Sequence, residues 1–170
     1  HEVDVVVYAT GFDVAGYLAP IRIRGLGGRD LAETWRGAPS AYLGITMSGF
    51  PNLFALMGPN TGLGHNSMIY MIEAQARYAT QAVLALREKK LRYLDVRADV
   101  QRAFTGEVDA RMAKTVWATG CKSWYLAGGG RNSTLWPGFT FDYAWQTRTL
   151  DLGAYDVVRE TEPARAGERR

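Results

Sequence analysis

Residues 53–86 read LFALMGPNTGLGHNSMIYMIEAQARYATQAVLAL and carry most of the architectural information in the chain. The apolar run Leu53–Met57 has the composition of a buried strand. Glycines and a proline between residues 58 and 64 predict a sharp turn. An apolar stripe at spacings of three and four then predicts the longest helix, capped by Asn66 or Ser67. The stripe consists of Met68, Ile72, Ala76, Ala79, Val83 and Leu86.

The turn aims the N-terminus of the predicted helix at a ligand. Free N–H groups and the helix dipole favour negative charge there, and glycines let the backbone approach closely. Phosphate is one candidate ligand, and the electron-rich edge of a reduced flavin is another. The turn is not a P-loop, because Leu63 stands where the second glycine is required and no Lys-Ser/Thr pair follows. Residues 62–67 give G-x-G-x-x-S, an imperfect dinucleotide fingerprint, so a helix start without any ligand remains open.

Further elements are predicted on both sides of this unit. Residues Val3–Ala9 are β-branched and mostly apolar, the pattern of a strand buried on both faces of a parallel sheet. Either later strands supply its partners, or the upstream half of a sheet is missing. Leu91–Val96 predicts a short strand and Ala98–Ala118 a second helix. One face of that helix carries Val100, Phe104, Val108 and Met112.

Composition narrows the class of protein. The chain has 170 residues, 47% hydrophobic and 22% charged, which allows a core of ordinary size. The formal charge of +3 is small, and no Lys/Arg stripe indicates nucleic-acid binding. No apolar run reaches the roughly 18 residues that a bilayer span needs. The single cysteine, Cys121, excludes an internal disulfide and suits a reducing compartment, so we expect a cytoplasmic protein.

Few residues are suited to metal binding or nucleophilic catalysis. His65 and His1 are the two histidines, and one internal histidine with one cysteine does not make a ligand set, so no metal site is expected. A nucleophile pair of Cys121 and His65 has no support from spacing. Trp124 and Trp136 lie in loop-like sequence and either pack in the core or form a stacking surface for a cofactor ring.

Three blocks of the sequence, taken in order, resemble one known family. Residues 4–12 read DVVVYATGF, similar to the A-T-G-[FY] strand end of the flavin-containing and Baeyer–Villiger monooxygenases. Residues 51–67 resemble the strand, turn and helix start beside the flavin ring of those enzymes. The third block resembles a late loop region of the Baeyer–Villiger-like branch. It contains Cys121–Tyr125, Gly130–Asn132, Leu135–Gly138 and Tyr143.

Some family motifs are absent. The two G-x-G-x-x-G motifs and the fingerprint F-x-G-x-x-x-H-x-x-x-W-P belong upstream of the A-T-G strand in relatives. Residues 126–137 imitate that fingerprint, but Leu126 and Asn132 stand where Phe and His belong. We interpret the imitation as coincidence, because it follows the A-T-G strand.

The resemblance implies an α/β fold, the C-terminal fragment of a flavoprotein with two Rossmann-like dinucleotide-binding domains for FAD and NAD(P). Residues 1–12 would be the last strand of the NADPH-binding domain and the crossover. Residues 13–158 would be the C-terminal part of the FAD-binding domain with substrate-facing loops. Residues 159–170 read as a disordered tail. The missing N-terminal portion of the same enzyme would then be the principal partner of this chain.

The resemblance also implies roles for individual residues. Trp124 matches a loop tryptophan that contacts NADP in relatives. No catalytic residue is implied, because the arginine that supports oxygen chemistry in the family lies upstream. The residues implied to lie against FAD are Thr10, Gly11, Gly58, Pro59, Asn66, Ser67 and Met68. The residues implied to line the substrate pocket are Leu63, Gly64 and His65.

The implied parent enzyme takes electrons from NADPH onto FAD and inserts one oxygen atom of O2 into a small organic molecule. For a Baeyer–Villiger oxidation the substrate is a ketone and the product an ester or lactone. Two alternatives stay open. One is a related monooxygenase that acts on nitrogen or sulfur. The other is a non-catalytic truncated module that binds a partner through an exposed sheet edge. The fragment alone is expected to be inactive.

Overall fold

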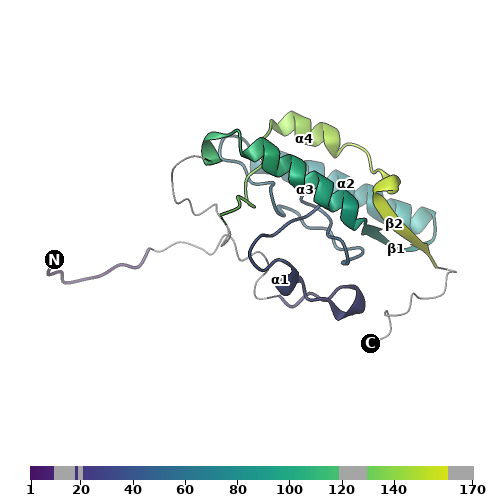
Figure 1. The fold of residues 1–170 in the computed structure, drawn as a ribbon, viewed down its shortest axis with the longest axis horizontal. Coiled ribbons are helices and arrows are strands. Elements are labelled where there is room, and N and C mark those ends of the chain that lie inside the picture. The colour runs from purple at the N-terminus through teal and green to yellow at the C-terminus, as the bar shows by residue number, and fades with distance from the viewer. Residues whose placement is uncertain (10–17, 19–20, 119–129, 161–170) are drawn as a thin grey trace.

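The computed structural model describes residues 1–9, 18, 21–118 and 130–160 of the 170-residue chain. Figure 1 shows these parts with their helices and strands labelled. In chain order the helices are η1 (Leu26–Gly28), α1 (Leu31–Thr34), α2 (Met68–Glu88), α3 (Ala98–Met112), η2 (Val116–Ala118), α4 (Thr140–Gln146) and η3 (Leu152–Ala154). The strands are β1 (Leu91–Val96) and β2 (Tyr155–Arg159).

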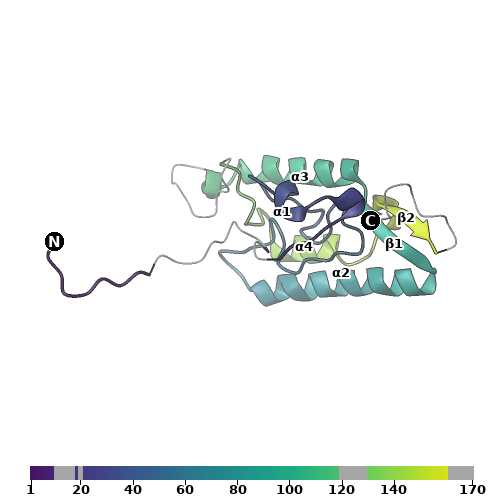
Figure 2. The same cartoon turned by 90° about the horizontal axis from the view of Figure 1, so that it is seen from below.

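The two long helices enclose an irregular middle. Figure 2 shows α2 and α3 on opposite sides of the segments that precede α2, and Figure 1 shows α4 above the two long helices and α1 below them. Backbone without repeating structure fills that space, and its polar groups are satisfied by turns, side chains and single bridges. The turn at residues 58–64 belongs to this middle layer.

One antiparallel sheet closes the C-terminal side of the described chain. β1 pairs with β2, from Leu91 opposite Arg159 to Val96 opposite Tyr155. The predicted strand at Leu91–Val96 is confirmed with the same bounds. β2 ends at Arg159, so a C-terminal tail begins no earlier than the residue after that strand.

Two predicted strands are wrong. Residues Val3–Ala9 form no strand and extend away from the body, with Val7 81% and Tyr8 85% exposed. Leu53–Met57 is half-buried coil in which Ala55 N donates to Ile45 O at 2.8 Å. A β-branched or apolar run becomes a strand only when a neighbouring chain satisfies its backbone groups. Within the described residues neither run lies beside a strand that could do so.

Helix α2 confirms the predicted helix, with Ser67 as its N-cap, but the predicted stripe is not the buried face. Members of the stripe are half-buried, and Val83 is 55% exposed. The buried face lies beside the predicted stripe, because Gln75 and Tyr78 form hydrogen bonds with Tyr143 and Tyr155 inside the protein. That face consists of Met71, Ala74, Gln75, Tyr78, Ala82 and Ala85.

Two buried hydroxyls join α2 to the sheet. The hydroxyl of Tyr78 lies 2.9 Å from that of Tyr155, which lies 3.1 Å from Thr46 Oγ1. Burial raises the pKa of both tyrosines above the usual value of the phenol, and the pKa of Tyr78 far above it. The chain of neutral hydroxyls therefore persists throughout the ordinary pH range.

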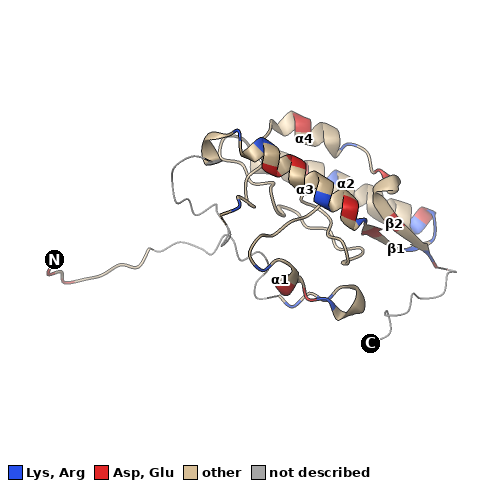
Figure 3. Cartoon of the chain, in the orientation of Figure 1, with Lys and Arg blue, Asp and Glu red and all other residues tan. Residues whose placement is uncertain are grey.

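Helix α3 begins at the predicted residue and ends earlier than expected. It runs to Met112 and is followed by the short helix η2, whereas the sequence predicted one helix through Ala118. Val108 and Met112 are buried as predicted, and Phe104 packs on the core. Figure 3 shows acidic and basic residues interspersed along the outer side of α3.

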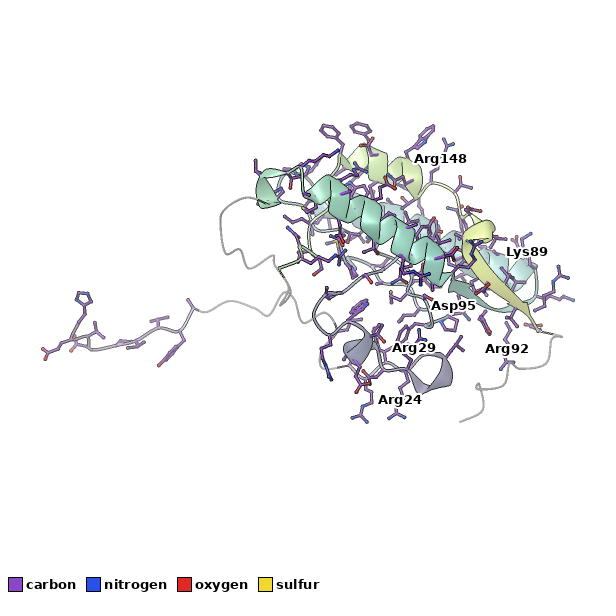
Figure 4. The ribbon with its side chains drawn as sticks, viewed as in Figure 1. Arg24, Arg29, Lys89, Arg92, Asp95 and Arg148 are labelled. Atoms are coloured by element: carbon purple, nitrogen blue, oxygen red, sulfur yellow. The ribbon has the colours of Figure 1, made fainter. Side chains whose placement is uncertain are left out.

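The region around α1 is tied to β1 by a loop. Asp95 accepts hydrogen bonds from Gly49 N at 2.8 and 3.1 Å, and Arg29 Nη1 donates to Ser48 O at 3.4 Å. Figure 4 labels Asp95 and Arg29. Gly49 has a φ of 86° and lies against Arg29, so the loop requires glycine there.

Candidate functional site: an anchored turn before α2

The turn at residues 58–64 has a backbone that few residues adopt. Met57 and Asn60 both have positive φ, 61° and 58°. Thr61, which is fully buried, donates from Oγ1 to Gly58 O at 2.7 Å and so closes the turn on itself. A Cβ atom on Gly58 would lie 2.3 Å from Gly44 O, so the backbone at Gly44 passes too close for any side chain at Gly58.

The N-terminal side of the turn is anchored by neutral, buried groups. Gln75, fully buried in α2, accepts from Met57 N at 2.8 Å and donates to the hydroxyl of Tyr143 at 3.0 Å. That hydroxyl donates in turn to Leu43 O at 2.6 Å. Burial raises the pKa of Tyr143 well above its usual range. A single line of hydrogen bonds thus joins α4, α2 and the segment that leads into the turn.

The C-terminal side is anchored by the backbone of residues 132–136. Gly62 forms an isolated parallel bridge with Leu135, in which Gly62 N donates to Thr134 O at 2.8 Å and Trp136 N donates to Gly62 O at 2.9 Å. A Cβ atom on Gly62 would lie 2.8 Å from Thr134 O. Close backbone pairing of two segments far apart in sequence therefore requires glycine here.

Arg131 adds a charged anchor on the same side. Its Nε donates to both carboxylate oxygens of Asp109 at 2.8 and 3.0 Å. Its Nη1 donates to Pro39 O at 2.7 Å and its Nη2 to Asn60 Oδ1 at 2.9 Å. The Asn60 side chain donates to Asn132 O and Leu135 O. Arg131 thereby links α3 to the turn.

The start of α2 carries no acidic side chain. Ser67 makes no side-chain cap, and the first turn of the helix contains no Asp or Glu. Asn66 instead accepts from Ser67 N at 2.7 Å and donates to Thr140 Oγ1 at 3.2 Å, while Met68 Sδ accepts from Leu63 N at 3.1 Å. The positive end of the helix dipole is thus not neutralised by an acidic side chain of its own first turn.

A cavity of about 300 Å³ lies beside this helix start. The Arg111 guanidinium sits 5.1 Å from the ring centre of Trp136 and 3.9 Å from the Asp142 carboxylate. The cavity is lined by His65, Arg111, Thr115, Trp117, Trp136, Pro137, Gly138, Phe139 and Asp142.

Most of the predicted site residues lie on one continuous segment, which runs from the turn at residues 58–64 into the start of α2. Leu63 packs with the cluster of Met71 and Trp136, while Gly64 and His65 are exposed. The predicted site residues on this segment are Gly58, Pro59, Leu63, Gly64, His65, Asn66, Ser67 and Met68. The residues that lie outside the described parts of the chain are Thr10, Gly11, Cys121, Trp124 and Leu126.

Sequence reasoning missed the residues that hold the turn. Gln75 stands on an apolar helix, and a polar residue on a buried face was the available signal. Asn60 and Arg131 lie in the quoted motif blocks, but Asn60 is 71 residues from Arg131 and 72 from Asn132, so these contacts are not readable from spacing. Asp109 had no signal beyond its place on α3.

Neither metal binding nor membrane spanning has a structural indication in the part of the chain described. Within residues 1–9, 18, 21–118 and 130–160, no three His, Cys, Asp or Glu side chains are grouped to hold a metal ion. Over the same residues, every helix is too short or too polar to cross a bilayer.

Comparison with known proteins gives a consistent picture. A scan against protein-family models finds no match. The chain is 44% identical over 171 residues to a Baeyer–Villiger monooxygenase of Pseudomonas aeruginosa, covering 99% of the chain and 32% of that protein. It is 45% identical over 168 residues to one of Streptomyces coelicolor, covering 98% and 32%.

Solved structures agree with these relatives. A cyclohexanone monooxygenase from Rhodococcus bound to NADP+ matches with a TM-score of 0.76 and 29% identity, over 94% of this chain and 31% of that one. OTEMO in complex with FAD and NADP matches with a TM-score of 0.81 and 27% identity, over 93% and 30%. The expected α/β flavoprotein fold is thereby confirmed. The chain spans about a third of the length of these proteins. Over nearly all of its residues, the chain belongs to the Baeyer–Villiger-type flavoprotein monooxygenase family.

Proposed function

We propose that this chain forms the flavin-facing and substrate-facing part of an FAD-dependent monooxygenase. The parent enzyme uses NADPH and inserts one oxygen atom of O2 into an organic substrate, a ketone in a Baeyer–Villiger oxidation. The observation that carries the proposal is the doubly anchored turn at residues 58–64, which leads into a helix start without acidic residues. The relatives in the family supply the cofactors by analogy.

The residues present fit a flavin ring. Gly58 and Gly62 let the turn pack directly on the backbone of Gly44 and Thr134, which fixes its shape before any ligand binds. The amide Nδ2 of Asn132 is a buried donor without a hydrogen-bond partner among the described residues. The N-terminus of α2 favours the negative charge that a reduced flavin carries at its ring edge.

In this proposal, bound FAD supplies the redox and oxygen chemistry. The chain positions the ring and shapes its field. Backbone at Gly58 and Pro59, with the first N–H groups of α2 after Asn66 and Ser67, would hold the ring edge. Met68 would pack near the ring. The hydrogen bond from Leu63 N to its sulfur already fixes the position of the side chain. Because these groups are fixed before the ligand arrives, little reorganisation is needed when charge develops.

The substrate would lie next to the same turn. Leu63, Gly64 and His65 remain the proposed pocket residues, and the cavity lined by His65 and Trp136 extends from them. In the full-length enzyme, exclusion of water by Trp117, Trp136 and Phe139 of this cavity would protect reactive oxygen species from wasteful release. A ketone substrate is consistent with relatives named as Baeyer–Villiger, cyclohexanone and steroid monooxygenases.

Other assignments rest on the resemblance. Thr10 and Gly11 would lie near FAD at the domain crossover, and Trp124 would contact NADP. The boundary at residue 12 stays as proposed, and the C-terminal boundary moves from residue 158 to Arg159, where β2 ends. The portion of the parent protein beyond this chain would complete both nucleotide sites. We also propose a cytoplasmic location, in keeping with a single cysteine.

The proposal is tested on the full-length gene product. The purified protein should be yellow, with FAD near one equivalent, and should oxidise NADPH faster when cyclohexanone is added. Product analysis under labelled O2 should find lactone carrying one labelled oxygen atom. If the enzyme forms sulfoxide from a thioether but no lactone from any ketone, its substrate is a sulfur compound and not a ketone. Absence of bound flavin and of NADPH oxidation would overturn the flavoenzyme assignment itself.

A further inference from the structure

Arg131 is held by three separate parts of the chain. Its partners are the carboxylate of Asp109 on α3, the carbonyl of Pro39 and the side-chain oxygen of Asn60 in the turn. The Arg131 side chain is 18% exposed, whereas its partner Asp109 is 43% exposed. Most surface ion pairs join two flexible side chains and contribute little. This guanidinium instead uses its planar set of donors at the junction of three segments.

The contact with Asn60 sets the orientation of an amide. Arg131 Nη2 donates to Asn60 Oδ1, so the Asn60 nitrogen must face the other way. There it donates to Asn132 O at 2.8 Å and to Leu135 O at 3.1 Å. A flipped amide would set its oxygen against those two carbonyls. Arg131 therefore selects the one amide orientation that holds the turn.

Asn60 in turn controls the backbone beside the proposed flavin site. It has a φ of 58°, is 4% exposed, and its own N–H donates to Ser133 O at 2.7 Å. It lies between Gly58 and Gly62, the two glycines at which neighbouring main chain leaves no room for a side chain. A rotation of Asn60 would shift the main chain on both sides.

We propose that Arg131 is a positioning residue that acts through Asn60 to hold the turn at residues 58–64 against the flavin ring. This inference rests on the proposed function. Arg131 follows directly on Gly130 in the third motif block, so one residue connects that block to the turn of the second block. Arg131 touches neither cofactor nor substrate in this role; it fixes the backbone that does.

The test compares Arg131→Met with Arg97→Met in the full-length gene product. Arg97 pairs with Asp99 at 2.7 Å at the start of α3, so the control also removes an arginine–aspartate pair of this helix. With FAD saturating, Arg131→Met should lower kcat by about tenfold to a hundredfold, the effect of a small misplacement at a reacting centre. The KM for NADPH should stay within about twofold, since Trp124 and not Arg131 is the residue proposed to contact NADP.

Two readouts are independent of turnover. The affinity for FAD should fall by about tenfold, as for loss of one charge-assisted hydrogen bond. The visible circular dichroism of bound flavin should change, because it reports the surroundings of the ring. Arg97→Met should leave both unchanged. Equal behaviour of the two variants would overturn the inference, while a wild-type protein without flavin would overturn the proposed function.

A double-mutant cycle shows whether the effect passes through Asn60. Asn60→Gly keeps the positive φ accessible and removes the amide. If Arg131 acts through that amide, Arg131→Met should weaken FAD binding by less than about twofold in the Asn60→Gly background. Additive losses would contradict the inference. Should Arg131→Met fail to fold, Arg131→Lys serves instead, because lysine keeps the charge but cannot serve three partners in one plane.

Discussion

The two sides of the turn at residues 58–64 are held by different physical means. On the N-terminal side, neutral groups form a line from the half-buried Met57 through the fully buried Gln75 and Tyr143 to the buried Leu43. On the C-terminal side, the charged pair of Arg131 and Asp109 is added to the backbone bridge of Gly62 and Leu135 and acts closer to the surface. The contribution of buried neutral groups to stability does not depend on salt, but removal of one partner leaves a buried polar group without a hydrogen bond. A half-exposed ion pair is screened by salt, and water can replace a lost partner. Four changes test this contrast.

The largest loss of stability is expected for Gln75→Ala. The change leaves Met57 N without its acceptor and opens a cavity in the buried face of α2. Together these effects should lower the free energy of unfolding by about 3 kcal/mol. Denaturant unfolding of the full-length gene product measures it. A loss no larger than that of Arg131→Met would contradict the contrast between the two sides.

A smaller loss is expected for Gly58→Ala. Its Cβ atom would lie 2.3 Å from Gly44 O and 3.1 Å from Ala55 Cβ, so the backbone must shift. Overpacking of this kind costs about 2 kcal/mol. Gly106→Ala on α3 is the matched control, since its Cβ atom would meet nothing within 4 Å, and it should stabilise the helix slightly. Equal midpoints for both variants would show that the turn moves freely at residue 58.

Tyr143→Phe should lower the free energy of unfolding by about 1.5 kcal/mol at neutral pH, because Leu43 O loses its donor. The same change has a pH signature. Burial raises the pKa of Tyr143 in the folded protein. The folded state then binds more protons than the unfolded state above about pH 10, so stability falls as pH rises through that range. Unfolding midpoints between neutral and alkaline pH should fall less steeply in Tyr143→Phe than in wild type.

The smallest effect is the response to salt. High NaCl screens the pair of Arg131 and Asp109 but leaves the neutral line through Gln75 intact. The difference in stability between wild type and Arg131→Met should therefore shrink by about 0.5 kcal/mol in 1 M NaCl. The difference between wild type and Gln75→Ala should stay constant. If both differences shrink alike, the two sides are not held by different forces.

The sequence predictions were accurate for elements whose backbone hydrogen bonds form within the element or with a neighbouring strand, and they failed for two runs without such a neighbour. α2, β1 and the start of α3 appeared where periodicity placed them. Helices form their hydrogen bonds internally, so local sequence is enough to locate them. The runs Val3–Ala9 and Leu53–Met57 have strand composition but no strand neighbour among the described residues, and so form none.

For the site, the sequence by itself determined the family and the path from turn to helix. Motif spacing placed Gly58, Leu63 and Ser67 on one connected segment, and local chain geometry keeps such neighbours together. Only the tertiary structure decided what holds that segment. Gln75 lies 18 residues from Met57, and Arg131 lies 71 residues from Asn60. Contacts at such distances depend on how helices and coil pack as a whole, and no local period in the sequence records them.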